Sequence, residues 1–448
     1  MKIALLGGGG FRVPMVFDAL LAHGGSLGLD EVTLYDVSEP RLAHITPVLE
    51  GLEQERGERL LFRPTTVLED ALDGADFVFC AIRPGQLEGR VVDERVPLDA
   101  GLVGQETMGP GGICMALRTV PVMVELARAA AERAPRAWFV NFTNPAGLVT
   151  EAIQDVLGGR AVGICDTPTS LCRRVAAALG RPQEELWFDY FGLNHLGWLR
   201  RVLDGDRDLL PDLLADDERL ESFEEGRLFG GDWLRSLGMI PNEYLYFLYF
   251  ASDTVDALRD GGASRGELLL RQQEVFYAGN GTTPQEALDA WRSARRERER
   301  TYFAEARSAA GLPDHVDDGH QAGGYEAEAI AVVQAITGNE GRVLILDTAN
   351  RSSLPFLDER AVVEVPCVVG RAGAIPTAVG AVPEHARALI ETIKDVERTT
   401  IRAALEGSSE LAVKALALHP LVPSVNVARR IFEQYAARHR SLAGRFAR

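Results

Sequence analysis

Short apolar runs alternate with longer amphipathic segments through the first third of the chain. The apolar runs are those expected of strands buried in a parallel sheet: KIALLG, EVTLYDV, DFVFCAI, AWFVNFT and AVGICD. Helical spacing of apolar residues predicts helices in PMVFDALLAHG, SEPRLAHITPVLEGLEQE and ICMALRTVPVMVELARAAAERA. Because strands that alternate with helices form parallel sheets with right-handed crossovers, we expect a Rossmann-like, doubly wound domain over residues 1–165.

The pattern is mixed after residue 165. The segment FDYFGLNHLGWLRRVLDGDRD predicts strands with a turn at Asp204–Gly205, and an acidic helical stretch follows over 207–237. The charged segment LDAWRSARRERERTYFAEARSAAG predicts a helix whose charged face is solvated rather than an RNA-binding patch. RVLILDT, AVVEVPCVV and GAIPTAVGAVP predict further strands before the C-terminal helices. We therefore expect an α/β protein with a second, mixed α+β domain over 166–448 that packs closely on the first.

Composition limits the class of protein and its partners. The 448 residues are 46% hydrophobic and 25% charged, as in ordinary globular proteins. A net charge of −18, from 47 basic and 65 acidic residues, argues against nucleic acid or an anionic membrane as a partner. Five scattered cysteines favour reduced thiols over a disulfide framework, and no apolar run is long enough to span a membrane or to form a signal peptide. We expect a cytoplasmic protein.

Four glycines follow the first predicted strand in MKIALLGGGGFRVP. Gly7 and Gly9 match the first two glycines of the G-x-G-x-x-G fingerprint, whereas Arg12 occupies the third place. The next helix would offer unpaired N–H groups to a pyrophosphate, and Asp36, after the second strand, could accept from ribose hydroxyls. Because an acid there would repel a 2′-phosphate, the pattern predicts NAD. The alternative is a glycine turn that only packs a helix on a strand.

Charged residues lie around a second glycine-rich segment, GLVGQETMGPGGICMALR. Glu106 lies among these glycines just before a predicted helix, which suggests a cavity wall, although the segment could be only a connection. Upstream, Arg83, Arg90 and Arg95 could form an anion clamp, although for any one of them a surface position is the more usual role.

Further polar residues follow predicted strands or lie near them. Asn144 in NFTNPAG is expected at the carboxyl edge of the sheet, where such folds bind ligands, although Asn-Pro is also an ordinary turn sequence. Cys165 in GICDTP and His195 in GLNHLGW do not have the spacing of a closed structural zinc site, so an open divalent-metal site and a buried structural role both remain possible. The tyrosines of IPNEYLYFLYF, among them Tyr244, could be catalytic or part of an aromatic core.

Taken together, the ordered motifs GGGGFRVP, GQETMGPGG, NFTNPAG, GICDTP, GLNHLGW, IPNEYL and SRGE resemble glycoside hydrolase family 4, the NAD- and divalent-metal-dependent glycosidases. The likeness covers most of the chain and is greatest to 6-phospho-β-glucosidases. It implies a fold like that of lactate and malate dehydrogenases. Residues 1–165 would bind NAD, and residues 166–448 would bind substrate and metal and form a homodimer or homotetramer.

The resemblance also implies roles for individual residues. Cys165 and His195 match the metal ligands, commonly of Mn²⁺. Tyr244 matches the catalytic base, Asp166 the general acid of α-specific members, and Glu106 a residue that raises the basicity of the tyrosine. The substrate-binding positions correspond to Arg90, Asn144 and Arg265, and the two arginines would serve the 6-phosphate of a phosphorylated sugar. The expected cofactor-binding residues are Gly7, Gly9, Gly10, Phe11, Arg12, Asp36 and Arg41.

The implied reaction is hydrolysis of a 6-phospho-β-glucoside, either a phosphorylated disaccharide or an aryl glucoside. It proceeds by NAD-dependent oxidation at C3, deprotonation at C2, elimination of the aglycone, addition of water and re-reduction. Tyr244 needs a pKa below its usual value near 10 to act as a base near neutrality, and a neighbouring cation could lower it.

Two departures from the family pattern matter. The usual turn, GGGS-x-x-[TS]-P, has hydroxyls that help to hold substrate phosphate, and Gly10 and Val13 occupy their places here. We hypothesise that Arg12 takes over part of this anion binding. Asp166 is typical of α-specific members, whereas β-specific members commonly have Asn there, so a 6-phospho-α-glucosidase or α-galactosidase is the alternative within the family. A hydroxy-acid dehydrogenase and a non-catalytic NAD sensor are alternatives from other classes.

Overall fold

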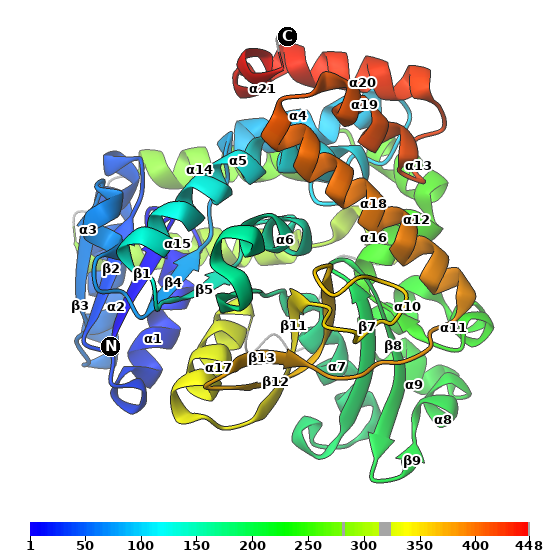
Figure 1. The fold of residues 1–448 in the computed structure, drawn as a ribbon, viewed down its shortest axis with the longest axis horizontal. Coiled ribbons are helices and arrows are strands. Elements are labelled where there is room, and N and C mark those ends of the chain that lie inside the picture. The colour runs from blue at the N-terminus through cyan, green and yellow to red at the C-terminus, as the bar shows by residue number, and fades with distance from the viewer. Residues whose placement is uncertain (280–282, 313–323, 447–448) are drawn as a thin grey trace.

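A nine-stranded sheet forms the centre of the protein in the computed structural model, which describes residues 1–279, 283–312 and 324–446 (Figure 1). Six of its strands run parallel in the order β3-β2-β1-β4-β5-β6, the order of dinucleotide-binding sheets. These strands are β1 (Lys2–Leu6), β2 (Glu31–Tyr35), β3 (Leu61–Thr65), β4 (Phe77–Cys80), β5 (Trp138–Asn141) and β6 (Ala161–Gly163). The predicted strands are confirmed, and β3 is an additional one.

Three antiparallel strands from the second half of the chain extend this sheet beyond β6. They are β11 (Arg342–Ala349), β12 (Val362–Gly370) and β13 (Gly373–Pro376). β11 pairs with β6 through Asp347 and Gly163. The strand predicted over GAIPTAVGAVP ends earlier than expected. Thr377 N–H still donates to Pro366 of β12, but the next donors, the N–H groups of Val379 and Gly380, donate to the carbonyl of Ser353 instead of to β12. The two halves of the chain thus share one sheet, and the boundary near residue 165 stays a prediction.

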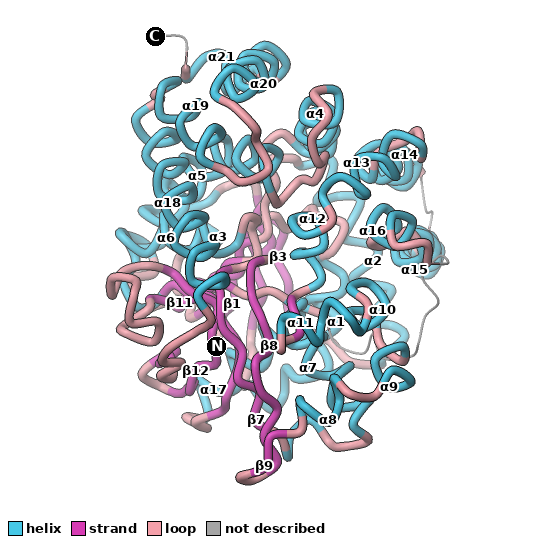
Figure 2. The backbone as a smooth tube through the Cα atoms, turned by 90° about the vertical axis from the view of Figure 1, so that its right-hand side faces the viewer, coloured by secondary structure: helices cyan, strands magenta, loops and turns pink. Residues whose placement is uncertain are grey.

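Alternating side chains of the parallel strands pack into two hydrophobic cores, one on each face of the sheet. Ile3 and Leu5 of β1 belong to one core, and Ala4 and Leu6 belong to the other. Figure 2 shows α1 and α2 on one side and α5 and α6 on the other. The helices of this half are α1 (Val13–Leu27), α2 (Glu39–Arg56), α3 (Leu68–Leu72), α4 (Gln86–Asp99), α5 (Gly109–Arg133), α6 (Ala146–Leu157) and α7 (Asp166–Leu179). The doubly wound architecture is confirmed.

A second, antiparallel sheet begins with the hairpin of β7 (Trp187–Leu193) and β8 (Leu196–Asp204). β9 (Arg207–Asp208) and β10 (Ile240–Pro241) both pair with β8. The predicted turn at Asp204–Gly205 separates β8 from β9, but the main reversal is the two-residue turn at Asn194–His195. The acidic stretch over 207–237 is helical after β9, as α8 (Leu210–Leu214), α9 (Asp217–Glu221), α10 (Glu224–Phe229) and α11 (Gly231–Leu237).

The charged segment over 288–311 is not one helix. It forms α15 (Pro284–Arg300) and α16 (Ala304–Ala309), which are separated near Phe303, a residue with φ of 56°. The predicted solvated face is found at Arg296 and Arg300, which are exposed. The prediction is wrong for Arg298 and for Tyr302 after the helix, because both line a partly enclosed cavity.

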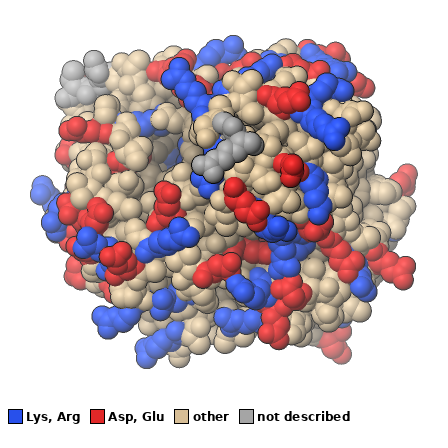
Figure 3. Space-filling view, turned by 45° about the horizontal axis from the view of Figure 1, so that its top comes forward, with Lys and Arg blue, Asp and Glu red and all other residues tan. Residues whose placement is uncertain are grey.

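Helices form most of the rest of the fold. Those after β10 are α12 (Tyr246–Tyr249), α13 (Ala251–Asp260), α14 (Arg265–Ala278), α17 (Tyr325–Gly338), α18 (Glu384–Glu406), α19 (Ser409–Leu418), α20 (Val425–Arg438) and α21 (Arg440–Arg445). No helix among the described residues combines the length and apolar character needed to cross a membrane. On the face in Figure 3, acidic and basic side chains are interspersed.

Candidate active site

A cavity of about 540 Å³ lies at the carboxyl ends of the parallel strands. It is lined by segments that follow β1, β2, β4, β5 and β6, and by residues of α14, α15 and α17. Ligands bind at this edge in open α/β sheets. Every residue to which the family resemblance assigns a role lines the cavity except Gly9. The structure therefore brings together residues that are spread over most of the sequence.

The glycine turn after β1 is built so that the backbone can reverse tightly. Gly7 has a φ of 93°, and a Cβ atom at this position would lie 2.5 Å from the carbonyl oxygen of Ala81, so only glycine fits. The N–H groups of Gly7 and Gly8 both donate to the carbonyl of Tyr35, at 2.8 and 2.7 Å. These bonds attach the turn to the end of β2.

Two backbone donors remain available at the start of α1. The N–H of Gly10 donates to the carbonyl of Gly7, but those of Phe11 and Arg12 donate to no other residue in the described part of the chain. Trp291 holds this backbone by donating to the carbonyl of Phe11 at 2.8 Å. Free N–H groups at a helix N-terminus stabilise a bound phosphate, so the turn fits a dinucleotide pyrophosphate.

Asp36 lies beside the turn. Its Oδ2 accepts from the N–H of Gly9 at 3.0 Å, and its Oδ1 accepts from Ser38 N–H at 2.9 Å. A carboxylate has lone pairs for further donors, so ribose hydroxyls can still bind. Gly9 therefore supports the site through Asp36 rather than by lining the cavity. Arg41 also faces the cavity, with its Cζ atom 4.5 Å from the ring centroid of Tyr277.

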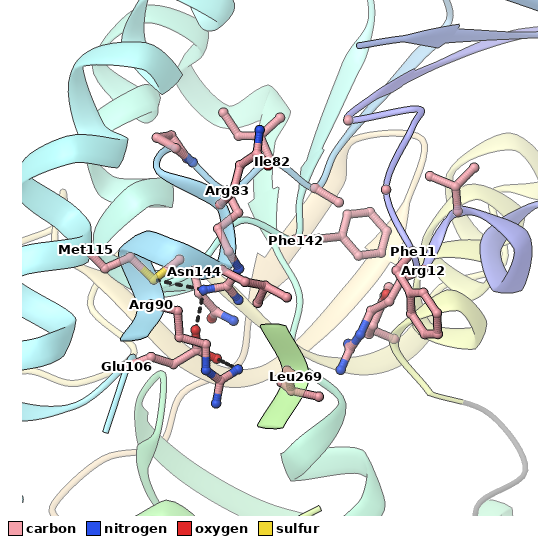
Figure 4. A pocket seen from close by; sticks show the side chains of 18 of the residues that line it. Phe11, Arg12, Ile82, Arg83, Arg90, Glu106, Met115, Phe142, Asn144 and Leu269 are labelled. Atoms are coloured by element: carbon pink, nitrogen blue, oxygen red, sulfur yellow. Dashed lines mark hydrogen bonds and ion pairs between the residues drawn. The ribbon is translucent and has the colours of Figure 1, made fainter. Parts of the chain in front are cut away.

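Glu106 lies between two arginines on the cavity wall (Figure 4). Arg83 forms an ion pair with one carboxylate oxygen, and Arg90 Nη1 lies 2.6 Å from the other. Burial favours the neutral acid, but the charges of Arg83 and Arg90 outweigh it and lower the pKa of Glu106 to about 2. Arg95 pairs with Glu267 and does not line the cavity, so the three arginines do not form one clamp.

Cys165 and His195 face one another across a short gap. Cys165 precedes α7, and His195 has a φ of 63° in the tight turn between β7 and β8. The Cys165 Sγ atom lies 3.6 Å from His195 Nε2. Burial lowers the pKa of His195 to about 3, so its imidazole is neutral and can donate a lone pair. A sulfur and a nitrogen donor in a cavity wall fit a divalent ion that keeps open positions for substrate.

Tyr244 stacks on this histidine. The two ring centroids are 3.8 Å apart and the ring planes differ by 9°. Asn242 orients the segment, because its Oδ1 accepts from Tyr244 N–H at 3.0 Å and its Nδ2 donates to Thr167 Oγ1 at 2.9 Å. Burial raises the pKa of Tyr244 above its usual value, while a hydrogen bond with Tyr302 opposes the shift. Of the other two candidates, Tyr246 stacks on Phe250 in the aromatic core, and Tyr249 accepts from Trp198.

The predicted substrate-binding residues differ in their surroundings. Asn144 precedes a cis proline and its side chain points into the cavity (Figure 4). Arg90 donates from Nε to Glu94 at 2.6 Å as well as pairing with Glu106. Arg265, at the start of α14, donates from Nη2 to the carbonyl of Arg298 at 2.9 Å. Asp166 lines the cavity in the first turn of α7.

Several cavity residues were not indicated by the sequence pattern. Arg298 and Tyr302 lie in a segment whose charge predicts a solvated face, and Tyr325 and Gln273 lie in segments without a recognisable motif. Only three-dimensional packing brings these residues to the cavity. A helical-wheel analysis could have placed Arg298 on the side of α15 that carries the buried Trp291, because the two residues are two helical turns apart.

A separate buried cluster also contains metal-ligating side chains. Asp93, Cys114 and His439 bring their ligand atoms within 4.8 Å of one another. Arg118 occupies the space between them, since its guanidinium donates to Asp93 Oδ1 and Oδ2 at 2.7 and 2.6 Å and contacts Cys114 Sγ at 3.1 Å. The cluster is therefore a structural ion pair that joins α4 and α5 to the C-terminal helices.

Comparison with known proteins agrees with this geometry. The description "Family 4 glycosyl hydrolase" matches residues 2–181, and "Family 4 glycosyl hydrolase C-terminal domain" matches residues 190–422. The 6-phospho-beta-glucosidase BglT of Thermotoga maritima is 30% identical over 97% of both chains.

Solved structures of 6-phospho-glucosidases are similar to this chain over nearly its whole length. The structure of the 6-phospho-beta glucosidase from Thermotoga maritima with manganese, NAD+ and glucose-6-phosphate has a TM-score of 0.82 at 27% identity, covering 98% of each chain. A 6-phospho-alpha-glucosidase from gut microorganisms, in complex with NAD and Mn2+, has a TM-score of 0.81 at 25% identity over 97% of each chain. The malate dehydrogenase of Plasmodium falciparum shares the fold at a TM-score of 0.51 and 13% identity, covering 90% of this chain and 98% of that chain, so the expected dehydrogenase-like fold is confirmed. Both halves of the chain match the same family, and the protein is a member of glycosyl hydrolase family 4.

Proposed function

We propose that this glycosidase hydrolyses 6-phospho-β-glucosides, using NAD and a divalent ion such as Mn²⁺. The observation that carries the proposal is one cavity that joins a dinucleotide turn, the Cys165–His195 pair and Tyr244. A plain hydroxy-acid dehydrogenase would have no need of this sulfur–nitrogen pair beside a stacked tyrosine. The named relatives support a phosphorylated glucoside as the substrate.

The N–H groups of Phe11 and Arg12 and the carboxylate of Asp36 would hold NAD, and Cys165 and His195 would hold the metal. When bound, NAD would accept and return a hydride at C3 of the sugar, while the divalent ion would act as a Lewis acid and favour ionised oxygens nearby.

The remaining roles belong to the side chains of this chain. Tyr244 would remove the C2 proton, and the phenolate that it needs is disfavoured by burial and so depends on nearby positive charge. Asp166 would donate a proton to the departing aglycone. Glu106 would stay ionised, because it lies between Arg83 and Arg90, and would hold both arginines in place. Asn144 would bind sugar hydroxyls from the edge of the sheet.

A 6-phospho-α-glucosidase is the second candidate. Asp166 favours it, because α-specific members have an acid at this position. The elimination tolerates either anomer, since the C1–O bond breaks only after C2 has lost its proton. The β-anomer is preferred here because the greatest likeness of the motifs is to 6-phospho-β-glucosidases.

The test is an assay of p-nitrophenyl β- and α-glucoside 6-phosphates with and without NAD and Mn²⁺. The proposal predicts release of nitrophenol from the β-anomer that depends on both cofactors and produces no net NADH. Activity that survives removal of both cofactors would refute it, and faster release from the α-anomer would favour the second candidate. An Arg12→Ala variant with an unchanged KM for the phosphorylated substrate would refute the anion-binding role of Arg12.

We also propose a homodimer or homotetramer, which light scattering after size-exclusion chromatography would test. A cytoplasmic location is proposed because all five cysteines are free thiols, which a reducing compartment preserves.

A further inference from the structure

We propose that Arg298, together with Arg12, forms the subsite that binds a phosphomonoester on C6 of the sugar. This inference rests on the proposed function and names residues for its substrate specificity. Arg298 lies in the last turn of α15 and Arg12 lies immediately before α1, so the two guanidiniums reach the same cavity from different halves of the chain.

The two arginines share a feature that distinguishes them from Arg83 and Arg90 of the same cavity. Neither forms an ion pair with any carboxylate in the part of the chain that the structure describes. Arg83 and Arg90, by contrast, both pair with Glu106. The negative charge of Asp166 acts on Arg12 without forming an ion pair, so the positive charge of the two guanidiniums is only partly offset. Such charge in a partly enclosed cavity favours an anionic ligand.

Aromatic rings orient both guanidiniums. Arg12 Cζ lies 4.6 Å from the ring centroid of Tyr325, and Arg298 Cζ lies 5.7 Å from that of Phe11. A ring that covers the face of a guanidinium leaves its in-plane N–H groups available. These N–H groups form the fork that binds phosphate oxygens in pairs.

Arg265 contributes to the subsite by holding Arg298. It donates to the carbonyl of Arg298 and to the carbonyl and hydroxyl of Thr301, where α15 ends. A cation at a helix C-terminus is favourable, because the last carbonyl groups lack partners within the helix. Arg265 therefore fixes the end of the helix that carries Arg298.

The charge of the site suits a dianion. Burial and the nearby positive charges of Arg12, Arg265 and Arg90 lower the pKa of Arg298, which shows the mutual repulsion of these cations. A phosphomonoester carries up to two negative charges and three acceptor oxygens, enough for two guanidiniums, whereas a carboxylate carries one charge. The subsite also explains how the turn can bind phosphate although Gly10 and Val13 have no hydroxyl.

Calorimetric titration of the protein loaded with NAD and Mn²⁺ tests the inference. The ligands are glucose 6-phosphate, inorganic phosphate, glucuronate and glucose. The variants are Arg298→Gln, Arg298→Lys and Arg12→Gln, and the control is Arg296→Gln, an exposed residue of the same helix. We expect Arg298→Gln and Arg12→Gln each to weaken glucose 6-phosphate binding by about 10- to 100-fold. Arg298→Lys should recover part of the loss, and Arg296→Gln should bind as the wild type does.

A change confined to the phosphorylated ligands supports the subsite. In the glycosidase assay, Arg298→Gln should raise KM for the phosphorylated substrate with a much smaller change in kcat. Unchanged binding of glucose 6-phosphate to Arg298→Gln would overturn the inference, as would equal weakening of NAD and glucose. Arg298-dependent binding of glucuronate rather than glucose 6-phosphate would overturn the assignment to phosphate. If Arg298 governs glucose 6-phosphate binding but no phosphorylated glucoside is hydrolysed, the proposed function fails and the subsite stands.

Discussion

Replacement of Glu106 by Gln tests how the cavity wall is held together. The carboxylate is buried between Arg83 and Arg90, which lower its pKa from 4.5 to about 2. This difference corresponds to about 3 kcal/mol of stability from the ionised form at neutral pH. Because the folded-state pKa lies below the unfolded one, this contribution is complete well above pH 4.5 and is lost as the pH falls toward 2.

We therefore expect Glu106→Gln to lower the free energy of unfolding by about 3 kcal/mol at pH 7 and by only about 1 kcal/mol at pH 3. Denaturant titrations at pH 7, 5 and 3 would measure both. Glu88→Gln is the matched control, because Glu88 is exposed on the neighbouring helix α4, and its loss should stay within about 0.5 kcal/mol. A deficit for Glu106→Gln that is below 1 kcal/mol at pH 7, or that does not shrink on acidification, would show that the two ion pairs do not stabilise the fold as argued.

Three further variants test other parts of the structure. Arg118→Met leaves Asp93 buried without its bidentate partner, so urea titration should show the free energy of unfolding lowered by about 3–5 kcal/mol. An unchanged free energy of unfolding would mean that His439 alone satisfies the carboxylate. Cys165→Ser removes the sulfur donor opposite His195, and calorimetry should show Mn²⁺ affinity reduced by at least about 10-fold; equal affinity would exclude Cys165 as a ligand. Asp36→Ala removes the acceptor of the Gly9 N–H, and fluorescence titration should show NAD binding weakened by about 10-fold or more, whereas an unchanged dissociation constant would contradict the proposed ribose contact.

Much of the fold was predictable because local patterns determine it. The parallel strands are apolar and flanked by amphipathic helices, so their periodicity indicates both the elements and the doubly wound arrangement. β3 (Leu61–Thr65) was not predicted, because it is a largely exposed or half-buried edge strand containing Arg63 and Pro64 and has no apolar run. The turn at Asn194–His195 between β7 and β8 was not predicted either. Two-residue hairpin turns are usually recognised by an Asn-Gly or similar pair, and this segment has none.

The candidate site was predictable as a set of residues, but its arrangement was not. Motifs indicate Cys165, His195 and Tyr244, whereas the stacking of Tyr244 on His195 depends on the bonds of Asn242 to Tyr244 and Thr167. The segment that carries Arg298 illustrates the same limit. A run of charged residues usually indicates a helix exposed to solvent. One residue of such a run, here Arg298, can still face the cavity when the helix packs against the rest of the protein.

The turn GGGGFRVP shows why both halves of the chain are needed for one site. Its glycines bond to the end of β2, but the carbonyls of Gly9 and Phe11 accept from Tyr277 and Trp291 of the second half. α15, which carries Trp291, also carries Arg298, and Arg265 holds the end of that helix. The same packing that fixes the dinucleotide turn therefore sets the distance between the turn and the guanidinium of Arg298. A change at Trp291 should consequently weaken binding of NAD and of glucose 6-phosphate together, whereas a change at Arg298 should weaken only the latter.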